Sequence, residues 1–413
     1  MEEFWLRSEN RRMNYNTSIV MRRHRLILTI LAAGTFISYS QKAERNKIIT
    51  VSNCLNVERE FETVSLSRES LAINSTDKLE QYGVREIGTT NFLITQCVDE
   101  DGDGISDVLL FQPKIMAHSK KKMELVRTSD APKASENWCY SRFVPERIDD
   151  YAWENNKVAF RTYGPVAQKM KEDGVKGGTL TSGIDAWLKR VEYPILNKWY
   201  EKYTNGTGTY HKDTGEGLDN FHVGDSRGIG GVALKVDDVY YFSKNFTTWK
   251  TITTGPIRTS FILTYADWDA AGNKISEVKH ISLDYGNFLS KFEISVSGTK
   301  TLSTGITLHE NDGKTEGNLK EGWIDYWQPL DDSELGTGIV FPKNTDISFE
   351  KYINSNKELC NLYATLKVKN NKVIYYSGFG WKKQGAFTTK EAWEKYLGEF
   401  AQKINNPITV KIK

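Results

Sequence analysis

The sequence predicts a mainly β fold of sandwich-like sheets with one helix near the C-terminus. Short runs of β-branched and aromatic residues recur between turn residues along the 413-residue chain, whereas helical periodicity is scarce. No blade-length repeat occurs, which argues against a propeller. The expected strands are 91–95, 108–111, 158–162, 184–191, 239–242, 260–265, 291–296, 362–368 and 373–377.

The clearest helical pattern lies near the C-terminal end. Thr388 and Glu391 have the spacing of a capping box, in which the two side chains satisfy free backbone N–H groups at a helix start. Residues 165–173 and 195–204 are expected to form two shorter helices. The C-terminal helix should reach about residue 403, because one face then carries Trp393, Tyr396, Leu397 and Phe400.

The N-terminus has the pattern of a signal peptide. Residues 22–25 are basic, residues 26–37 are apolar but too few to span a bilayer, and small or polar residues follow to Ser40. Met21 lies where such a signal would begin, so residues 1–20 are expected to be an over-called start. We therefore expect a periplasmic or secreted protein without a membrane span, with residues 41–413 forming one unit. Residues 45–145 are expected to be its N-terminal sheet layer.

Charge and cysteine content narrow the possible partners. The first 40 residues hold six Arg and three acidic residues, which leaves 49 basic and 50 acidic residues in the remainder. Such a near-neutral chain is not a nucleic-acid binder by bulk charge. The spacing of the four cysteines fits no zinc pattern, and an oxidising compartment would permit disulfides in any of three pairings.

The glycine-rich segment 208–231 carries the candidate chemistry. It contains Tyr210, His211, His222 and Arg227 among several acidic residues. Histidine and tyrosine can remove and donate protons, while an arginine can neutralise a carboxylate and so acidify the carbon beside it. A zinc site using both histidines and one carboxylate is the competing chemical interpretation, and a mobile polar loop is the non-functional one. The glycines of 226–231 lack the ending of a phosphate loop and are expected to allow close backbone approach or a sharp turn.

Two further regions could contact a ligand. On the strand beginning near residue 184, Trp187 and Lys189 share one face. This pair could form a subsite for an anionic sugar, or it could be an aromatic side chain that covers the sheet beside a solvated lysine. His309 with Glu310 could form another acid–base pair, or His309 could be a hydrogen-bonded residue at a strand end.

An acidic run precedes the strand at 108–111. Asp99, Asp101, Asp103 and Asp107 surround Gly104 in the order of calcium-binding loops, although Leu110 stands where an EF-hand has glutamate. A structural calcium site and an acidic hairpin turn both fit this pattern.

Six ordered motifs resemble one bacterial family over nearly the whole chain after the leader. The motifs are "YGP", "GIDAWLKRVEYPILNKWY", "YHKDTGEGLDNFHVGDSRGIGG", "NFTTWKTITTGPIRTSF", "GWIDYWQPLDDSELGTGIV" and "GFGWKKQGAFTTKEAWEKYL". They are similar to a family classed as a domain of unknown function, whose members lie in gene clusters for degrading uronic-acid-containing polysaccharides. The resemblance implies the activity of an ulvan oligosaccharide dehydratase.

This resemblance implies a β-supersandwich related to galactose-mutarotase-like folds. It also implies removal of water across C4–C5 of a non-reducing-end glucuronic or iduronic acid, linked to sulfated rhamnose. For that reaction we expect His211 or His222 as base, Tyr210 or the other histidine as acid, and Arg227 as the carboxylate clamp. The adjoining sulfated sugar would contact Trp187, Lys189, Arg190 and His309. No cofactor is required for this chemistry, although a divalent metal at the two histidines could perform the clamping.

Other activities are compatible with the same residues. A uronate polysaccharide lyase would cleave a glycosidic bond by the same elimination, and a glycoside hydrolase would need two facing carboxylates, for which Asp213, Glu216 and Asp219 are candidates. A non-catalytic carbohydrate-binding protein would explain the aromatic residues but leaves the clustered histidines unexplained.

Overall fold

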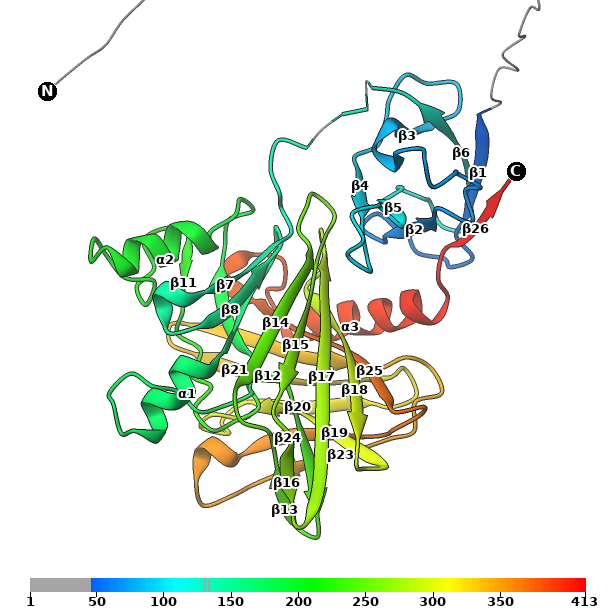
Figure 1. The fold of residues 1–413 in the computed structure, drawn as a ribbon. Helices are drawn as coiled ribbons and strands as arrows, with labels where there is room; N and C mark the ends of the chain where they lie inside the picture. Colours follow the sequence, from blue (N-terminus) through cyan, green and yellow to red (C-terminus); the bar gives the residue numbers. More distant parts are fainter. Residues whose placement is uncertain (1–45, 130, 133) are drawn as a thin grey trace, which may run out of the picture. The chain divides into compact units, whose positions relative to one another are not determined.

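Antiparallel β-sheets dominate the computed structural model, which describes residues 46–129, 131, 132 and 134–413 (Figure 1). The signal peptide and the over-called start expected within residues 1–40 lie outside these residues. Residues 46–413 form one compact unit. The mainly β prediction, with a helix near the C-terminus, is confirmed.

The largest sheet has nine strands and forms one layer of the sandwich. Eight strands follow one another in space, and β16 (Trp268–Ala270) pairs with β17 at the margin. The spatial order is β14 (Phe246–Thr253), β15 (Arg258–Tyr265), β17 (Asn273–Asp284), β18 (Leu289–Ser297), β25 (Lys372–Trp381), β22 (Ser333–Val340), β21 (Trp323–Leu330) and β20 (Lys314–Asn318).

A five-stranded sheet forms the second layer. Apolar side chains of the two sheets, such as Phe261, Ile281, Val232 and Ile306, are fully buried in one continuous core. In the large sheet β17 alternates buried and part-exposed residues, as a half-buried strand does, whereas the central strands of the five-stranded sheet are buried on both faces. The strand order is β13 (Val239–Tyr241), β12 (Ile229–Val236), β19 (Thr301–Thr307), β24 (Asn361–Lys367) and β23 (Ile347–Tyr352).

A third sheet, also of five strands, carries most of the candidate site. Two helices accompany it, α1 (Pro165–Glu172) directly after β9 and α2 (Leu196–Thr204) between β10 and β11. The strand order is β11 (Gly217–Leu218), β10 (Asp185–Lys189), β9 (Ala159–Tyr163), β8 (Asp150–Glu154) and β7 (Tyr140–Val144).

The N-terminal layer consists of two small sheets around a separate apolar cluster. The C-terminal strand β26 (Thr409–Ile412) pairs antiparallel with β1 (Lys47–Ser52), so the last residues of the chain complete the first sheet (Figure 1). The remaining strands of these sheets are β6 (Lys120–Arg127), β3 (Tyr82–Glu86), β2 (Val64–Ser67), β5 (Val108–Phe111) and β4 (Thr95–Val98).

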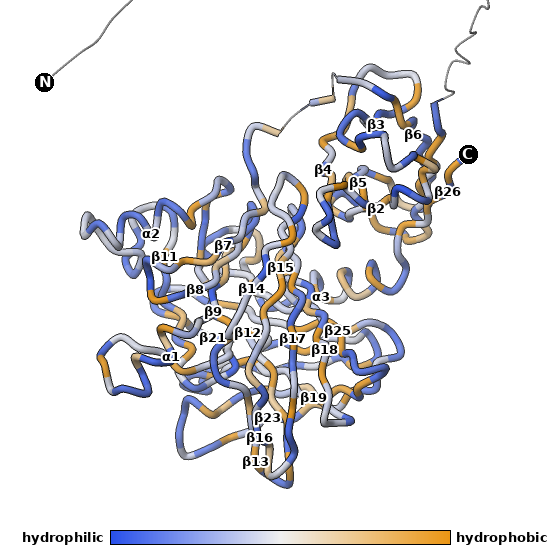
Figure 2. Tube along the Cα trace, in the orientation of Figure 1, coloured by the Kyte–Doolittle hydropathy of each residue, from blue (hydrophilic) through white to orange (hydrophobic). Residues whose placement is uncertain are grey.

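Helix α3 (Lys390–Asn405) packs against glycines of the large sheet. A Cβ atom at Gly336 would lie 2.7 Å from the Trp393 ring, and one at Gly338 would lie 2.8 Å from Leu397. Glycine, whose side chain is a single hydrogen atom, is needed at these sheet positions for the helix to approach so closely. Apolar and polar residues mix along this helix, as its one-sided burial requires (Figure 2).

The helix start and one strand differ from the sequence prediction. The N-cap is Thr389, whose side chain accepts a hydrogen bond from the Ala392 N–H at 3.3 Å, so the expected capping role of Thr388 is wrong by one residue. A strand was expected at 91–95, but strand β4 begins only at Thr95. Before Thr95, Phe92 forms a single β-bridge with Arg85.

Candidate active site

The segment 208–231 is held against strand β10 at two glycines. At Gly217 (φ +114°) a Cβ atom would lie 1.9 Å from the Leu188 carbonyl oxygen, and at Gly228 (φ +59°) it would lie 1.9 Å from that of Ile184. Both glycines therefore permit close backbone approach to a neighbouring segment of the chain. The close approach to a ligand expected of the glycines in 226–231 stays a prediction. The intervening residues are bound at both ends to a buried strand and curve around a pocket.

This pocket has a volume of about 420 Å³, within the usual range for small-ligand sites. Both histidines of the segment line it, together with residues from β9, α1 and the turn at Glu358. The lining residues are Arg161, Tyr163, Lys171, Gly178, Thr179, Leu180, His211, Asp219, Asn220, Phe221, His222, Val223, Gly224, Asp225 and Glu358.

A buried arginine with several aspartates forms the inner wall of the pocket. The Arg161 guanidinium donates to Asp185 Oδ2 at 2.6 and 2.9 Å and to Asp219 Oδ2 at 2.9 Å. Asp150 lies 3.6 Å from the same guanidinium. The Tyr163 hydroxyl donates to Asp185 Oδ2 at 3.2 Å, which links one ring at the pocket surface to the buried charges.

This cluster holds more carboxyl groups than nearby cations can neutralise. Burial raises the pKa of Asp185 to about 7 and that of Asp150 to about 6, although Arg161 opposes both shifts. Burial also raises the pKa of Asp219. The cluster therefore holds an exchangeable proton near neutral pH, next to a pocket that a substrate can enter.

The hydrogen bonds of His211 define its tautomer. Its Nδ1 lies 2.9 Å from the backbone carbonyl oxygen of Asp219, and a carbonyl can only accept. Nδ1 therefore carries a proton, with Asp219 Oδ2 also 3.6 Å away, and in the neutral ring Nε2 holds the lone pair. The side chain is about half exposed, at 53%, so this lone pair is available to a ligand as a base.

His222 is paired with a carboxylate from a distant part of the chain. Its Nε2 lies 3.1 Å from Glu358 Oε1, while Glu358 Oε2 accepts from the backbone N–H of Asp225 at 2.9 Å. Because a carboxylate oxygen can only accept, Nε2 of His222 is the donor in this contact and carries a proton. The ring is 70% exposed, which leaves it open to a ligand.

His309 supports the backbone beneath His222 and is not among the pocket residues. Its Nε2 donates to the His222 carbonyl oxygen at 2.7 Å, and its Nδ1 lies 2.9 Å from the amide of Gln328. Burial lowers the pKa of His309, which favours the neutral ring. The nearest Gln328 atom is Oε1, which cannot donate, so a neutral ring requires the amide oxygen and nitrogen to be exchanged. The N–H₂ then donates to Nδ1, and the buried Gln328 nitrogen, which otherwise has no partner, is satisfied. Both ring nitrogens are therefore used internally, and the expected substrate contact is wrong.

Arg227 is buried in the protein and cannot clamp a substrate at this pocket. Its guanidinium donates to Ser182 Oγ at 3.0 Å and to the Asp225 carbonyl oxygen at 3.0 Å, and it lies 3.7 Å from the centre of the Phe242 ring. Burial lowers the pKa of this arginine. The expectation of a carboxylate clamp was wrong because the residue after the glycine-rich turn points into the sandwich.

Tyr210 and Trp187 pack on one another beneath the pocket. Their ring centres are 4.7 Å apart, both are buried, and the Tyr210 hydroxyl accepts from Arg147 at 3.2 Å and Arg161 at 3.4 Å. Trp187 also lies under the Arg161 guanidinium at 5.1 Å. Neither residue lines the pocket, so the expected proton donor and stacking platform instead support Arg161.

Lys189 and Arg190 also have structural partners. Lys189 is fully buried and donates to Glu154 at 2.8 Å, and the same carboxylate accepts from the first backbone N–H groups at the start of α2. Arg190 pairs with Asp213 at 3.0 Å. Lys189 cannot reach a sugar, so its expected role as a sulfated-sugar contact is wrong. Arg190 is 38% exposed and is not among the pocket residues, and its expected contact stays a prediction.

The acidic loop brings three of its four aspartates together. Possible ligand oxygens of Asp99, Asp101 and Asp107 lie within 4.8 Å of one another, and Asp103 is outside this group. Backbone N–H groups donate to all of these carboxylates, for example from Gly104 to Asp99 at 2.8 Å. These hydrogen bonds are those of an acidic hairpin turn, which explains the aspartates without a bound ion. The calcium site stays a prediction. Within the described residues, the histidine pair is not part of any comparable group.

Sequence reasoning missed several residues of the site, including Lys171 and the buried Asp150 and Asp185, and three others show why. Arg161 and Tyr163 lie at alternate positions of a strand that otherwise reads as core, and Glu358 is 136 residues from His222. A charged residue inside an apolar strand pattern was the available signal for Arg161. Nothing in the local sequence marks Glu358, because its contact exists only in the folded chain.

The cysteines and the helices were also compared with the expectations from the sequence. All four cysteines are free thiols, and burial raises the pKa of Cys97 to about 12. Across the described residues, no helix is both long and apolar enough to cross a membrane.

Comparison with known proteins identifies relatives over nearly the full length. An uncharacterized protein, P7, from Formosa agariphila is 55% identical over 394 residues, which cover 95% of this chain and all of the relative. Two solved structures from Enterococcus faecalis are distantly similar. One is a protein in the glycosyl hydrolase family 38 (TM-score 0.47, 11% identity), and the other is an alpha-mannosidase (TM-score 0.43, 9% identity). Each comparison covers 90% of this chain, but this chain spans only 48% and 46% of those proteins. The model of a domain of unknown function, DUF4861, matches residues 51–410, and the chain therefore belongs to the DUF4861 family.

Proposed function

We propose that this protein removes water across C4–C5 of a uronic acid at the non-reducing end of an ulvan oligosaccharide, leaving a 4,5-unsaturated uronyl group. The observation that carries the proposal is the pair of exposed histidines in one pocket, each with a different hydrogen-bond partner. His211 is held with a free Nε2 lone pair, and His222 is held against a carboxylate. One base and one acid are what an elimination of water requires.

The proposed elimination moves one proton to His211 and one proton from His222. His211 Nε2 takes the C5 proton, and the electrons of that C–H bond form the C4–C5 double bond. The C4–O bond breaks as the imidazolium of His222 gives its proton to the leaving hydroxyl, which departs as water. Both histidines then exchange one proton with solvent and return to their starting states.

The substrate carboxylate needs a cation that is not already neutralised. Arg161 is bound to Asp185 and Asp219, so it orients the inner wall and is not a free clamp. Lys171 lines the same pocket and is exposed. Within the described part of the chain its ammonium group has no hydrogen-bond or ion-pair partner, although it is close enough to Glu358 to help lower the pKa of that carboxyl. We therefore assign the carboxylate contact to Lys171, where it would stabilise the charge that develops as the C5 proton leaves.

The test uses ulvan oligosaccharides that end in a saturated uronic acid. The purified protein is incubated with them, and ultraviolet absorbance and product mass are followed together. Loss of one water from an otherwise intact oligosaccharide, with rising absorbance from the conjugated double bond, is the expected result. An unchanged substrate would contradict the proposal for this sugar, and two smaller products would indicate a lyase or hydrolase.

A matched pair of variants tests the role of Lys171. Lys171→Met keeps the side-chain length but removes the charge, and it should raise KM and lower kcat/KM by about tenfold or more, as expected for a lost charge-assisted contact. Lys176→Met, on the neighbouring exposed turn, is the control. Equal kinetics for the two variants would remove Lys171 from the site.

A further inference from the structure

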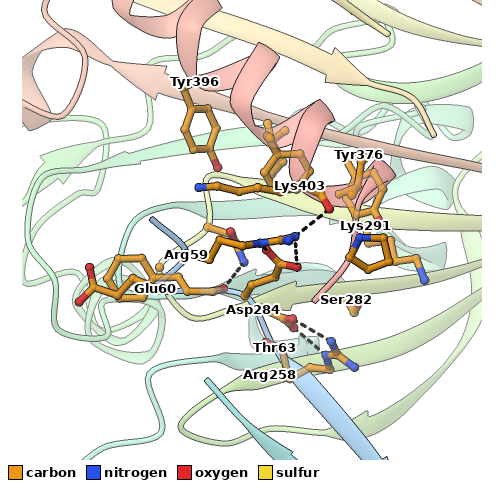
Figure 3. Close-up of a pocket in the computed structure, with 18 of the residues that line it drawn as sticks. Arg59, Glu60, Thr63, Arg258, Ser282, Asp284, Lys291, Tyr376, Tyr396 and Lys403 are labelled. Atoms are coloured by element: carbon orange, nitrogen blue, oxygen red, sulfur yellow. Dashed lines mark hydrogen bonds and ion pairs between the residues drawn. The ribbon is translucent and has the colours of Figure 1, made fainter. Parts of the chain in front are cut away.

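A second cavity of about 470 Å³ lies elsewhere in the molecule and shares no lining residue with the first (Figure 3). Residues 58–63 of the N-terminal layer form one wall. Strands β15, β17, β18 and β25 and helix α3 form the others. Nothing in the chemistry proposed for the histidine pocket uses this cavity.

Two ion pairs build its walls. The Arg59 guanidinium pairs with Glu62 and also donates to the backbone carbonyl oxygen of Lys403 at 3.0 Å, which fastens the N-terminal segment to α3. Arg258 donates to the two carboxylate oxygens of Asp284 at 2.6 and 2.8 Å. These charges neutralise one another, so they shape the cavity without favouring a ligand of either sign.

Three other charged residues of the lining have partners outside it, since Glu58 and Glu60 pair with Lys114 and Lys291 pairs with Glu293. The lining groups without a partner are mostly donors. The ammonium group of Lys403 has no hydrogen-bond or ion-pair partner within the described residues, although it lies close enough to Glu62 to oppose the rise of that carboxyl pKa. The hydroxyls of Tyr376 and Ser282 likewise have no partner there. The Tyr396 hydroxyl accepts from the Phe288 N–H at 3.0 Å and keeps its own proton to donate. Figure 3 shows Tyr396 and Lys403 reaching from α3 toward Arg59.

Aromatic rings lie beside these donors. Phe61 is 37% exposed, and Tyr376, Tyr396 and Phe400 also line the cavity. Burial raises the pKa of Tyr376 to about 12, so its hydroxyl keeps its proton at neutral pH. Aromatic faces pack against the C–H faces of sugar rings, whereas unpaired donors and one unpaired ammonium favour oxygen-rich anions.

We propose that this cavity is a second binding site, for a saccharide that carries one carboxylate or sulfate group. Lys403 pairs with the oxyanion, the hydroxyls of Tyr376 and Ser282 bind sugar hydroxyls, and the ring of Phe61 contacts the apolar face. The volume is sufficient for a small saccharide. This assignment does not depend on the dehydration chemistry, since no residue is shared between the two cavities.

The test measures binding by saturation-transfer NMR with three probes. Methyl β-glucuronide carries a carboxylate, glucose 6-sulfate carries a sulfate, and methyl β-glucoside is the neutral control. At least one anionic probe should bind more tightly than methyl β-glucoside, and which one binds tells a uronate site from a sulfate site. Lys403→Met should weaken anion binding by about tenfold, as expected for the loss of a charged hydrogen bond.

Matched variants locate the binding. Lys395→Met changes an exposed lysine of the same helix and should leave the affinity unchanged. Tyr376→Phe removes only a hydroxyl and should weaken binding, which keeps the test valid if Lys403→Met does not fold. The affinity should persist in His211→Ala/His222→Ala. The proposal is overturned if neither anion binds, if methyl β-glucoside binds equally well, if binding is lost only in the histidine variant, or if neither Lys403→Met nor Tyr376→Phe weakens it.

Discussion

The base and acid roles proposed for His211 and His222 rest on their hydrogen-bond partners. A backbone carbonyl oxygen accepts from Nδ1 of His211, whereas a carboxylate accepts from Nε2 of His222. Two identical side chains in one pocket therefore acquire different proton-transfer properties. The sequence showed that both histidines belong to one segment but could not assign base and acid, because Glu358 approaches only in the folded chain.

The buried carboxyl group of Asp185 should make stability depend on pH. Its pKa is raised to about 7 in the folded state, so between about pH 4 and about pH 7 the folded chain binds more protons than the unfolded chain. Asp185 therefore lowers the free energy of unfolding progressively as the pH rises through that window. In Asp185→Asn, the decline of unfolding free energy between about pH 5 and about pH 8 should be shallower than in the wild type.

Urea denaturation at several pH values measures this effect. Asp312→Asn, at an exposed position, provides the control and should keep the wild-type pH dependence. Parallel curves for wild type and Asp185→Asn would show that Asp185 is ionised throughout and that the cluster holds no exchangeable proton.

At the scale of single elements, helix α3 depends on its first residue. The Thr389 side chain accepts from the Ala392 N–H, whereas Thr388 makes no such cap. Thr389→Ala should therefore lower the free energy of unfolding by about 1 kcal/mol. Thr388→Ala is the control and should have a smaller effect. Chemical denaturation of both variants measures the two losses of unfolding free energy. A larger loss for Thr388→Ala would show that Thr388 is the N-cap, as the capping-box spacing predicts.

Strand and helix positions were predictable wherever the local pattern was strong. The strand at 108–111 and the three helices were expected within a residue or two of their observed bounds, because apolar periodicity determines which face is buried. Trp187 and Lys189 were misassigned for a shared physical reason. The site sheet is buried on both faces, so the alternation at its start did not separate an open face from a core face.

At the scale of the whole molecule, the C-terminal strand completes the N-terminal layer. β26 pairs with β1 along four residues, and Val410 and Ile412 pack against the cluster of that layer. A chain ending at Pro407 should lose this edge and become more susceptible to protease between residues 46 and 127. Lys411→Ala, which changes an exposed position of the same strand, is the control. An unchanged digestion pattern after the truncation would show that the layer is stable without β26.

The central claim is that the histidine pocket removes water from an acidic saccharide. The most direct measurement is the rate of ultraviolet absorbance increase on saturated-end ulvan oligosaccharides for wild type, His211→Ala and His118→Asn, with product mass checked in parallel. His118 is an exposed histidine outside the pocket with a left-handed backbone that asparagine tolerates. We expect His211→Ala to lose about 100-fold or more of the rate, and His118→Asn to match the wild type. A wild-type rate in His211→Ala, or no loss of water with the wild-type protein, would contradict the claim.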